Sequence, residues 1–392
     1  MKKIYSVIFV LLAFILSIGC FTGFYNTFAY YEKEKNISIN AKSGILVDYK
    51  TNTVIYSKNE LEHLPIASMC KIMTLVLCFE AMENNEISIG ETVIVSENAS
   101  GMGGSQVFLE TNGEYLVGDL IKSIVVASAN DACVAMAEKI CGSESAFIEK
   151  MNNKASELGM ENTVFVNCTG LPQAGQYSCA KDVSVMFKEL LKYEDYYKFS
   201  RIWTDVVLHP NNRKTEISNT NKLVRFYKGC DSGKTGFTSE AGHCLSASAM
   251  RNGMRLICVV IGAPSSKERF ATVSDMFNFA FANFENKKII ENDKPLNIKV
   301  NVSNGKKKEL SVIPENSVYL FCKKNTKKGI EISFEPLKKI CAPVYKGSKV
   351  GKLIAFENGV EIGSVNVIAN ETILEKTYFD NIKNIVNNWG LI

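Results

Sequence analysis

Ser68 and Lys71 are the residues of this 392-residue chain whose types and spacing most directly suggest chemistry. They stand three positions apart in Ser68-Met69-Cys70-Lys71, and residues three apart on a helix share a face, so the hydroxyl and the amine can meet. A neutral lysine can take the proton of a serine hydroxyl and make the serine a nucleophile. The pair therefore predicts covalent catalysis without a histidine base, which suits a chain with only three histidines.

The S-x-x-K spacing alone does not identify a nucleophile, because it occurs again at Ser178 to Lys181 and at Ser303 to Lys306. A second motif narrows the choice. Lys234-Thr235-Gly236 is the single K-T-G in the chain, and it follows a turn-like segment and leads toward a predicted hairpin. Order along the chain, rather than spacing, therefore has to select the serine.

Two S-x-N elements lie between Ser68 and the K-T-G, at Ser96-Glu97-Asn98 and at Ser128-Ala129-Asn130. The second falls in the break between two predicted helices, where a turn can aim both polar side chains into a cleft. Ser68 is the one S-x-x-K serine that precedes both elements. The sequence thus indicates one candidate site built from three separate segments.

S-x-x-K, S-x-N and K-T-G in this order are typical of penicillin-binding proteins and class A β-lactamases. At these residues the chain resembles the low-molecular-weight penicillin-binding proteins, specifically the serine-type D-alanyl-D-alanine carboxypeptidases. The likeness is strong over residues 40–285 and weaker beyond, and further segments resemble the family in its own order, at residues 103–105, 128–132, 157–163, 167–172 and 233–238. Cys70 stands where threonine is common, and Ala129 where glycine is. Neither departure removes a catalytic group.

The resemblance implies catalytic roles for three side chains and two backbone amides. Ser68 would attack the carbonyl of the penultimate D-alanine, with Lys71 as base and Ser128 as proton relay to the leaving amine. Lys71 must be neutral to act, and we expect burial and a nearby cation to lower its pKa. The backbone amides of Ser68 and Phe237 would form the oxyanion hole.

The resemblance also implies substrate-binding roles for Asn130, Lys234, Thr235 and Gly236. Asn130 would hold the peptide amide of the substrate and steady the catalytic lysine. Lys234 and Thr235 would bind the free carboxylate, which explains why an exopeptidase needs a cation there. No metal and no cofactor are expected.

The implied function is removal of the terminal D-alanine from peptidoglycan pentapeptide stems through an acyl-enzyme on Ser68, with β-lactams as covalent inhibitors. A class A β-lactamase shares the motifs but deacylates with a glutamate, and no E-x-x-L-N element lies between residues 130 and 234. That activity is therefore the second hypothesis. A wall-binding or β-lactam-sensing protein that is acylated without turnover is the non-enzymatic alternative.

The elements that must position these residues read as mixed α and β up to about residue 284. Helical spacing of apolar residues predicts helices at residues 68–82, 116–127 and 131–140. Hairpins are predicted at residues 45–56 and at 243–262, the second through Asn252-Gly253. The resemblance implies an α/β (α+β) fold of the penicillin-binding-protein and β-lactamase transpeptidase type, an antiparallel sheet flanked by helices, over residues 30–286.

Beyond residue 286 the composition changes. Residues 287–352 hold sixteen lysines and six acidic residues, and short alternating runs predict a small all-β domain over 287–370. The basic excess suits either contact with an anionic envelope or membrane surface, or a solvated lysine-rich face. The whole chain carries only +4, which gives no signal for nucleic acid.

The amino-terminal segment predicts the compartment in which the protein acts. Lys2 and Lys3 precede an apolar run, and Thr27-Phe28-Ala29 offers a cleavage site, which together are typical of a secretory signal over residues 1–29. An uncleaved anchor over residues 4–24 and a lipoprotein signal at Gly19-Cys20 are the alternatives. Export to the outer face of the cell membrane is the expected localisation.

The last segment, residues 371–392, is expected to form an amphipathic helix. Its apolar residues recur at helical spacing, at Tyr378, Phe379, Ile382, Ile385, Val386, Trp389 and Ile392. Its polar face is nearly neutral, so burial of apolar surface would dominate peripheral binding to a membrane. Packing onto its own β domain is the alternative.

Twelve cysteines are unusual in an exported chain, where disulfides are favoured. Cys70 and Cys78, and likewise Cys133 and Cys141, are eight apart in predicted helices, about 12 Å by the helical rise, which is too far for a disulfide. We expect most of the cysteines to be small buried apolar residues rather than a disulfide framework.

Overall fold

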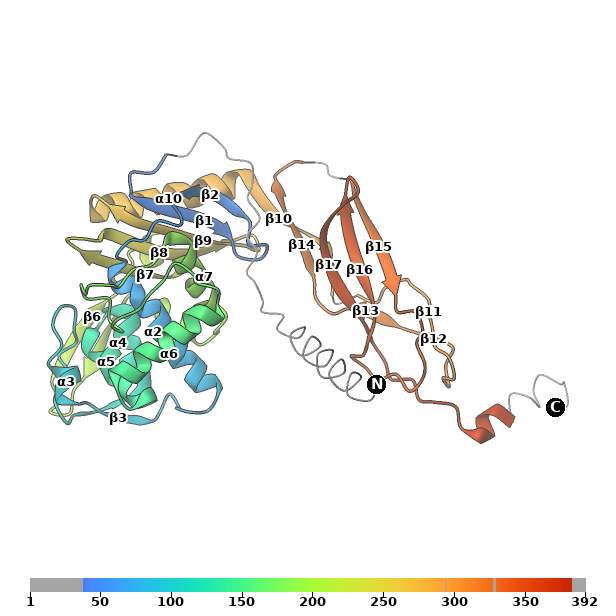
Figure 1. Cartoon of the computed structure of the whole chain (residues 1–392), viewed down its shortest axis with the longest axis horizontal. Coiled ribbons are helices and arrows are strands. Elements are labelled where there is room, and N and C mark those ends of the chain that lie inside the picture. The colour runs from blue at the N-terminus through green and yellow to red at the C-terminus, as the bar shows by residue number, and fades with distance from the viewer. Residues whose placement is uncertain (1–37, 293, 327–328, 383–392) are drawn as a thin grey trace, which may run out of the picture. The chain divides into compact units, whose positions relative to one another are not determined.

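The computed structural model describes residues 38–292, 294–326 and 329–382, and these fall into two compact units that meet in sequence between Ala282 and Asn283 (Figure 1). The first unit holds every candidate catalytic residue. The second is the β-rich part that follows. The signal expected over residues 1–29 lies outside the described residues.

The first unit is built on a five-stranded antiparallel sheet with the order β2-β1-β9-β8-β7. Both predicted hairpins are confirmed, and Asn252 and Gly253 turn the second with φ of +49° and +77°. The K-T-G lies on β7, which is an edge strand of the sheet. The strands are β1 Ser43–Asp48, β2 Val54–Lys58, β7 Cys230–Thr238, β8 Gly242–Arg251 and β9 Met254–Ala263.

Helices cover both faces of this sheet. Ile257 and Val259 of β9 belong to the apolar core that also contains residues of the helix after Ser68, whereas the intervening Cys258 contacts Met276 of α10. The three predicted helices are confirmed as α2 Lys71–Glu83, α4 Val117–Val126 and α5 Asn130–Cys141, with a 3-10 turn, η1 Ala67–Cys70, leading into α2. The remaining helices are α3 Glu97–Ser100, α6 Glu144–Glu157, α7 Ala180–Leu190, α8 Tyr196–Ser200, α9 Leu223–Phe226 and α10 Ser266–Asn283.

Two short hairpins complete the first unit. One pairs β3 Thr92–Ile94 with β4 Glu114–Leu116, and the other pairs β5 Thr204–Leu208 with β6 Lys214–Ser218. Figure 1 shows the resulting arrangement, in which the sheet lies between α10 and the group of helices that includes α2 and α5. The expected antiparallel sheet flanked by helices is therefore confirmed.

The second unit is the expected small β domain. Its main sheet has the order β13-β17-β16-β15, over Val312–Pro314, Val360–Ala369, Lys349–Glu357 and Ile330–Pro336. Two further pairs join β10 Phe284–Ile290 to β14 Val318–Lys323 and β11 Val300–Asn301 to β12 Glu309–Leu310. The expected boundary after residue 286 falls inside β10, because this strand pairs along its length with β14 and so belongs wholly to the second unit.

The helix expected over residues 371–392 begins at residue 378, where its apolar pattern starts, rather than at residue 371. The chain from 371 to 377 is extended and makes bridges from Ile373 to Val344 and from Glu375 to Gly305. A helical turn follows at residues 378–382, where Tyr378 and Phe379 are 76% and 80% exposed. Residues 383–392 of the expected helix lie outside the described part. Within that part, no helix is long and apolar enough to cross a membrane.

One close approach in the first unit requires a glycine. Gly170 has a φ of +80°, and a Cβ built on it would lie 2.0 Å from the carbonyl oxygen of Ala67. The loop over residues 167–172 therefore lies directly against the turn that carries Ser68. Gly142 is a useful comparison, because its φ is +77° and a Cβ there would meet nothing within 4 Å.

We predict that Gly170→Ala destabilises the first unit by about 3 kcal/mol, since it combines left-handed strain with a backbone overlap. Gly142→Ala should cost only about 1 kcal/mol, because it carries the strain alone. Urea unfolding of the two variants and the wild type measures both. Equal losses in the two variants would show that the loop can move away from the turn at no cost.

Candidate active site

Ser68 lies in a turn that strand β7 approaches very closely. The turn is the 3-10 segment η1, and Ala67 before the serine has a φ of +48°. A Cβ on Gly236 would lie 2.7 Å from the carbonyl oxygen of Ile66 and 3.2 Å from the backbone nitrogen of Ser68. The glycine of the K-T-G is thus what lets β7 reach the serine.

Lys71 is the first residue of α2 and is completely buried. Its Nζ donates hydrogen bonds to Ser68 Oγ at 3.0 Å and to the carbonyl oxygen of Thr169 at 2.5 Å. Burial lowers the pKa of Lys71, because a charged amine loses its hydration there. The predicted meeting of the serine and the lysine is therefore present, in an environment that favours the neutral amine.

Lys234 on β7 is also buried, with 1% of its surface exposed. Its Nζ donates to Ser128 Oγ at 2.7 Å and to the carbonyl oxygen of Thr235 at 3.1 Å. Burial and then the positive charge of Lys71 hold the pKa of Lys234 well below its usual range. Ser128 has a φ of +62° in the break between α4 and α5, as expected for a turn that aims its side chain inward.

Asn130 opens α5, and its side chain is fixed from one end. Its Nδ2 donates to the carbonyl oxygen of Gly103 at 2.6 Å, and its backbone nitrogen donates to the carbonyl oxygen of Ser105 at 2.7 Å. Its Oδ1 is buried and has no hydrogen-bond partner among the described residues. No hydrogen bond joins the described side chains of Asn130 and Lys71, and the free acceptor of Asn130 is available to a donor on a ligand.

Phe237 and Thr235 flank Gly236 on β7 with different exposures. Thr235 is buried, whereas the Phe237 ring is 57% exposed and stacks on His243 with centroids 4.4 Å apart. All the side chains predicted for the site thus lie on η1, α2, the α4–α5 break and β7, which the fold brings together.

Three supporting residues were not given a role from the sequence. The carbonyl oxygen of Thr169, in one of the segments that resemble the family, accepts from Lys71 Nζ. Arg269 of α10 donates to the carbonyl oxygens of Gly236 and Cys244 at 3.1 and 3.3 Å, and so links β7 to β8 beside the K-T-G.

Asp131 accepts hydrogen bonds from the backbone nitrogens of Val107 and Leu109 at 3.1 Å each. In the sequence, Asp131 was marked only by its position directly after Asn130, in the segment 128–132 that resembles the family.

The competing motifs have structural roles instead. Ser96 is the N-cap of α3 and accepts from the backbone nitrogen of Ala99 at 3.0 Å. Ser178 is buried and shares a hydrogen bond of 2.8 Å with Thr163. Ser303 lies in the second unit. The choice of Ser68 from its order along the chain stays a prediction.

The cysteines of the first unit do not form a disulfide framework. The nine that the structure describes there are free thiols, and all but Cys141 are buried. The two pairings excluded from helical geometry are accordingly not made. Burial raises the pKa of Cys70 and that of Cys133 to about 12, so both thiols next to Lys71 stay neutral. No cluster of His, Cys, Asp and Glu among the described residues could hold a metal ion.

Comparison with known proteins agrees with this geometry. Residues 30–265 match the family of D-alanyl-D-alanine carboxypeptidases, and residues 284–375 match the C-terminal domain of penicillin-binding protein 5. The chain belongs to the D-alanyl-D-alanine carboxypeptidase family. It is 40% identical to the D-alanyl-D-alanine carboxypeptidase DacF of Bacillus subtilis over 91% of this chain and 92% of that protein.

Solved structures of family members extend the similarity to three dimensions. Penicillin-binding protein 5 of Haemophilus influenzae is 30% identical, with a TM-score of 0.73 over 88% of this chain and 100% of that one. Penicillin-binding protein D2 of Listeria monocytogenes, in its ampicillin-bound form, is 28% identical, with a TM-score of 0.56 over 63% of this chain and 100% of that one. This carboxypeptidase is therefore a serine hydrolase of the penicillin-binding-protein fold, and the family and fold expected from the motifs are confirmed.

Proposed function

We propose that Ser68 is the nucleophile and Lys71 its base in the removal of a terminal D-alanine. The observation that carries this assignment is the 3.0 Å hydrogen bond between a completely buried Lys71 Nζ and Ser68 Oγ. The neutral amine takes the hydroxyl proton as Oγ bonds to the carbonyl carbon of the penultimate D-alanine. The bond to the terminal D-alanine then breaks, and water hydrolyses the acyl-enzyme.

Ser128 and Lys234 provide a route for the proton that the leaving amine needs. Ser128 Oγ already accepts from Lys234 Nζ at 2.7 Å, so its own proton is directed away from Lys234. As Ser128 gives that proton to the departing D-alanine nitrogen, it would take up the proton that Lys71 received from Ser68, so that Lys71 is again neutral when the acyl-enzyme has formed. Neither step needs a histidine.

The carboxylate of the substrate is proposed to lie between Lys234 and Thr235, with Gly236 leaving room for the peptide. An arriving carboxylate favours the protonated form of Lys234 and offsets the burial of its charge. The unpartnered Oδ1 of Asn130 would accept from an amide N–H of the substrate. Asn130 Oδ1, the site acceptor that lacks a partner among the described residues, would thereby gain one when the substrate is bound.

The oxyanion hole is proposed to be formed by the backbone amides of Ser68 and Phe237. The support is the close approach of Gly236 to the turn around Ser68, which places consecutive backbone groups of β7 beside those of η1. Two amides directed at one point stabilise the negative charge that develops on the carbonyl oxygen.

The substrates we propose are peptidoglycan stem peptides that end in D-alanyl-D-alanine, with β-lactams as covalent inhibitors. A β-lactam presents a carbonyl and a carboxylate to the same two groups of the cleft, and the Listeria relative has been solved with ampicillin bound. Hydrolysis of β-lactams as the main activity is the weaker candidate, because the chain has no E-x-x-L-N element between residues 130 and 234.

The proposed location is outside the cytoplasm, at the outer face of the cell membrane. The charged, apolar and small-residue order of residues 1–29 supports export. The exposed rings of Tyr378 and Phe379, at the start of the terminal apolar pattern, support peripheral attachment. The adjacent extended segment over residues 371–377 makes backbone hydrogen bonds to the rest of the second unit. A membrane-bound terminal helix would therefore hold that unit at the membrane surface.

The activity is tested by incubating the protein with a pentapeptide that ends in D-alanyl-D-alanine and measuring free D-alanine. We expect release by the wild type and a loss of at least about a thousandfold in Ser68→Ala, because the nucleophile is removed. Ser178→Ala is the matched control and should retain wild-type activity if folded. Release by Ser68→Ala at the wild-type rate would contradict the assignment of the nucleophile.

The pH dependence of D-alanine release tests the two lysines. Activity should rise with pH as Lys71 loses its proton and fall again as Lys234 loses its own, and because burial lowers both pKa values, both limbs should lie below the ordinary lysine range. The falling limb should lie at higher pH for kcat than for kcat/KM, since bound carboxylate raises the pKa of Lys234.

Lys234→Arg provides the control for this profile, because a guanidinium stays charged and should move the falling limb to higher pH. A falling limb that stays in place in this variant would show that another group is responsible.

Membrane attachment is tested by deleting residues 378–392 from the full chain. After processing of the signal is verified by N-terminal sequencing, the truncated protein should leave the membrane fraction, whereas the wild type should remain there. Retention of the truncated, processed protein on the membrane would refute the role of the terminal segment. Substitution of Tyr378 and Phe379 by serine should cause a partial release of the same kind.

A further inference from the structure

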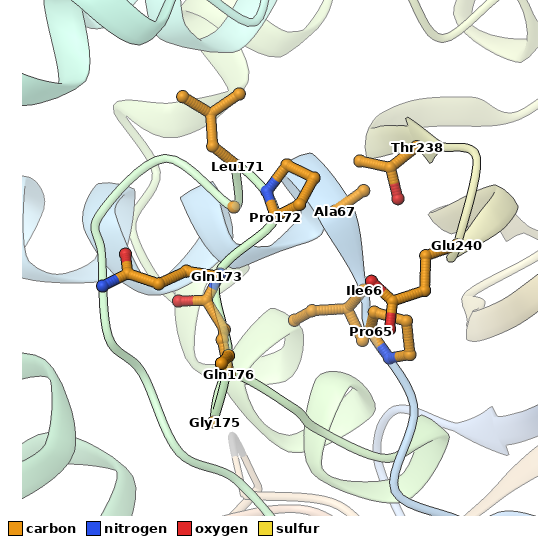
Figure 2. Close-up of a pocket in the computed structure, with 12 residues that line it drawn as sticks. Pro65, Ile66, Ala67, Leu171, Pro172, Gln173, Gly175, Gln176, Thr238 and Glu240 are labelled. Atoms are coloured by element: carbon orange, nitrogen blue, oxygen red, sulfur yellow. The ribbon is translucent and has the colours of Figure 1, made fainter.

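A pocket of about 410 Å³ opens beside the nucleophilic turn (Figure 2). Its walls come from residues 65–67, from the loop over residues 170–176 and from Thr238 and Glu240 at the end of β7. Ser68 itself is not part of the lining. Thr238 follows the K-T-G at the end of β7, so the pocket lies toward the carboxyl-terminal end of that strand. Figure 2 shows the Glu240 side chain reaching toward Pro65 and Ile66.

The walls of this pocket are held firmly. Asn167 Oδ1 accepts from the backbone nitrogen of Gly170 at 2.7 Å, and its Nδ2 donates to the carbonyl oxygen of Leu171 at 3.0 Å and to Gln173 Oε1 at 3.1 Å. Gln176 Oε1 accepts from the backbone nitrogens of Val166 and Asn167. The amide oxygens of both glutamines are therefore engaged in holding the loop, and the pocket is formed before any ligand arrives.

Glu240 is the one charged side chain in the lining. Lys42 lies nearby, but its Nζ donates to the backbone carbonyl of Glu240 at 3.3 Å rather than to the carboxylate. Within the described ranges no ion pair to the Glu240 carboxylate is found. Opposite it stand the apolar side chains of Ile66, Leu171 and Pro172. An acid at the rim of an apolar wall suits a ligand with a methylene chain that ends in a cation.

The register of the substrate on β7 indicates which group reaches this pocket, on the basis of the function proposed above. With the carboxylate at Lys234 and Thr235 and the reacting carbonyl at Ser68 and the Phe237 amide, an extended peptide continues along the edge strand toward Thr238. Each further residue advances by about 3.3 Å. The residue that precedes the two D-alanines therefore comes to lie beside Thr238, at the mouth of the pocket.

We infer that this pocket binds the side chain of the residue before D-alanyl-D-alanine, and that Glu240 selects stems in which this side chain ends in a free amino group. The methylene chain packs on the apolar wall, and the ammonium pairs with the carboxylate. Glu240 is thus a specificity-determining residue that touches neither the reacting carbonyl nor the leaving group.

The test compares Nα-acetyl-L-lysyl-D-alanyl-D-alanine with its Nα,Nε-diacetyl analogue, which differs only in lacking the terminal charge. Release of D-alanine is measured at low ionic strength, and the ratio of kcat/KM for the free amine to that for the acetylated amine is determined. We expect a ratio of about five for the wild type, the range of a solvent-accessible ion pair, and a fall toward one in 0.5 M sodium chloride.

Glu240→Gln should bring the ratio to about one, and Glu240→Lys should bring it below one, because a cation at the rim repels the ligand. Glu83→Gln, an exposed change at the end of α2, is the matched control and should keep the wild-type ratio. Covalent labelling with a fluorescent penicillin verifies that each variant retains a folded cleft.

The possible outcomes separate this inference from the function on which it rests. A wild-type ratio of one, or a ratio that Glu240→Gln leaves unchanged, would overturn the selection by Glu240 while D-alanine release still supports the carboxypeptidase assignment. Absence of D-alanine release from both substrates by the wild type would overturn both. A fall in the ratio for Glu240→Gln that Glu83→Gln does not reproduce would support the inference.

Discussion

The constraint on which the site depends is the burial of two lysines in one cleft with hydroxyl and carbonyl partners. Lys71 donates to Ser68 and Thr169, and Lys234 donates to Ser128 and to the carbonyl oxygen of Thr235, so these four partners are all neutral oxygens. Burial disfavours the charged form of both amines, and among the described residues neither lysine has an ion pair with a carboxylate that would offset this cost. Burial thus lowers the pKa of both lysines, which suits the roles proposed for them, Lys71 as a base and Lys234 as the partner of a carboxylate.

The rest of the first unit maintains this arrangement. Gly236 and Gly170 let a strand and a loop touch opposite sides of the turn around Ser68, where a side chain would overlap backbone atoms. Arg269 then ties β7 to β8 at the level of Gly236. The Asp131 carboxylate accepts hydrogen bonds from the backbone of residues 107–109 and so fixes this loop next to the start of α5. Precise distances between the two lysines and the two serines follow from these close approaches, because a well-packed core resists even small displacements.

The unusual cysteines also become intelligible in this context. Cys70 and Cys133 are enclosed in the same core that encloses Lys71, and burial raises the pKa of both thiols to about 12. Neutral thiols add neither charge nor strong acceptors, so they fill space next to the base without competing for its proton. The pocket at Glu240 is lined in part by residues 65–67 beside the same turn, and the role proposed for it concerns a part of the substrate that does not react.

Local patterns in the chain were sufficient for the hairpins, the helices and the three motifs, since hydrogen bonding in a turn or helix involves residues only a few positions apart. Ser68, Lys71, Ser128 and the K-T-G could be assigned to one site from their order. The Thr169 carbonyl, Arg269 and the pocket at Glu240 could not. Their partners lie 98, 33 and more than 60 residues away in sequence, and a spacing of that size becomes a contact only when layers pack. The start of the second unit at Asn283 was likewise decided by the pairing of β10 with β14, a long-range register that no local pattern encodes.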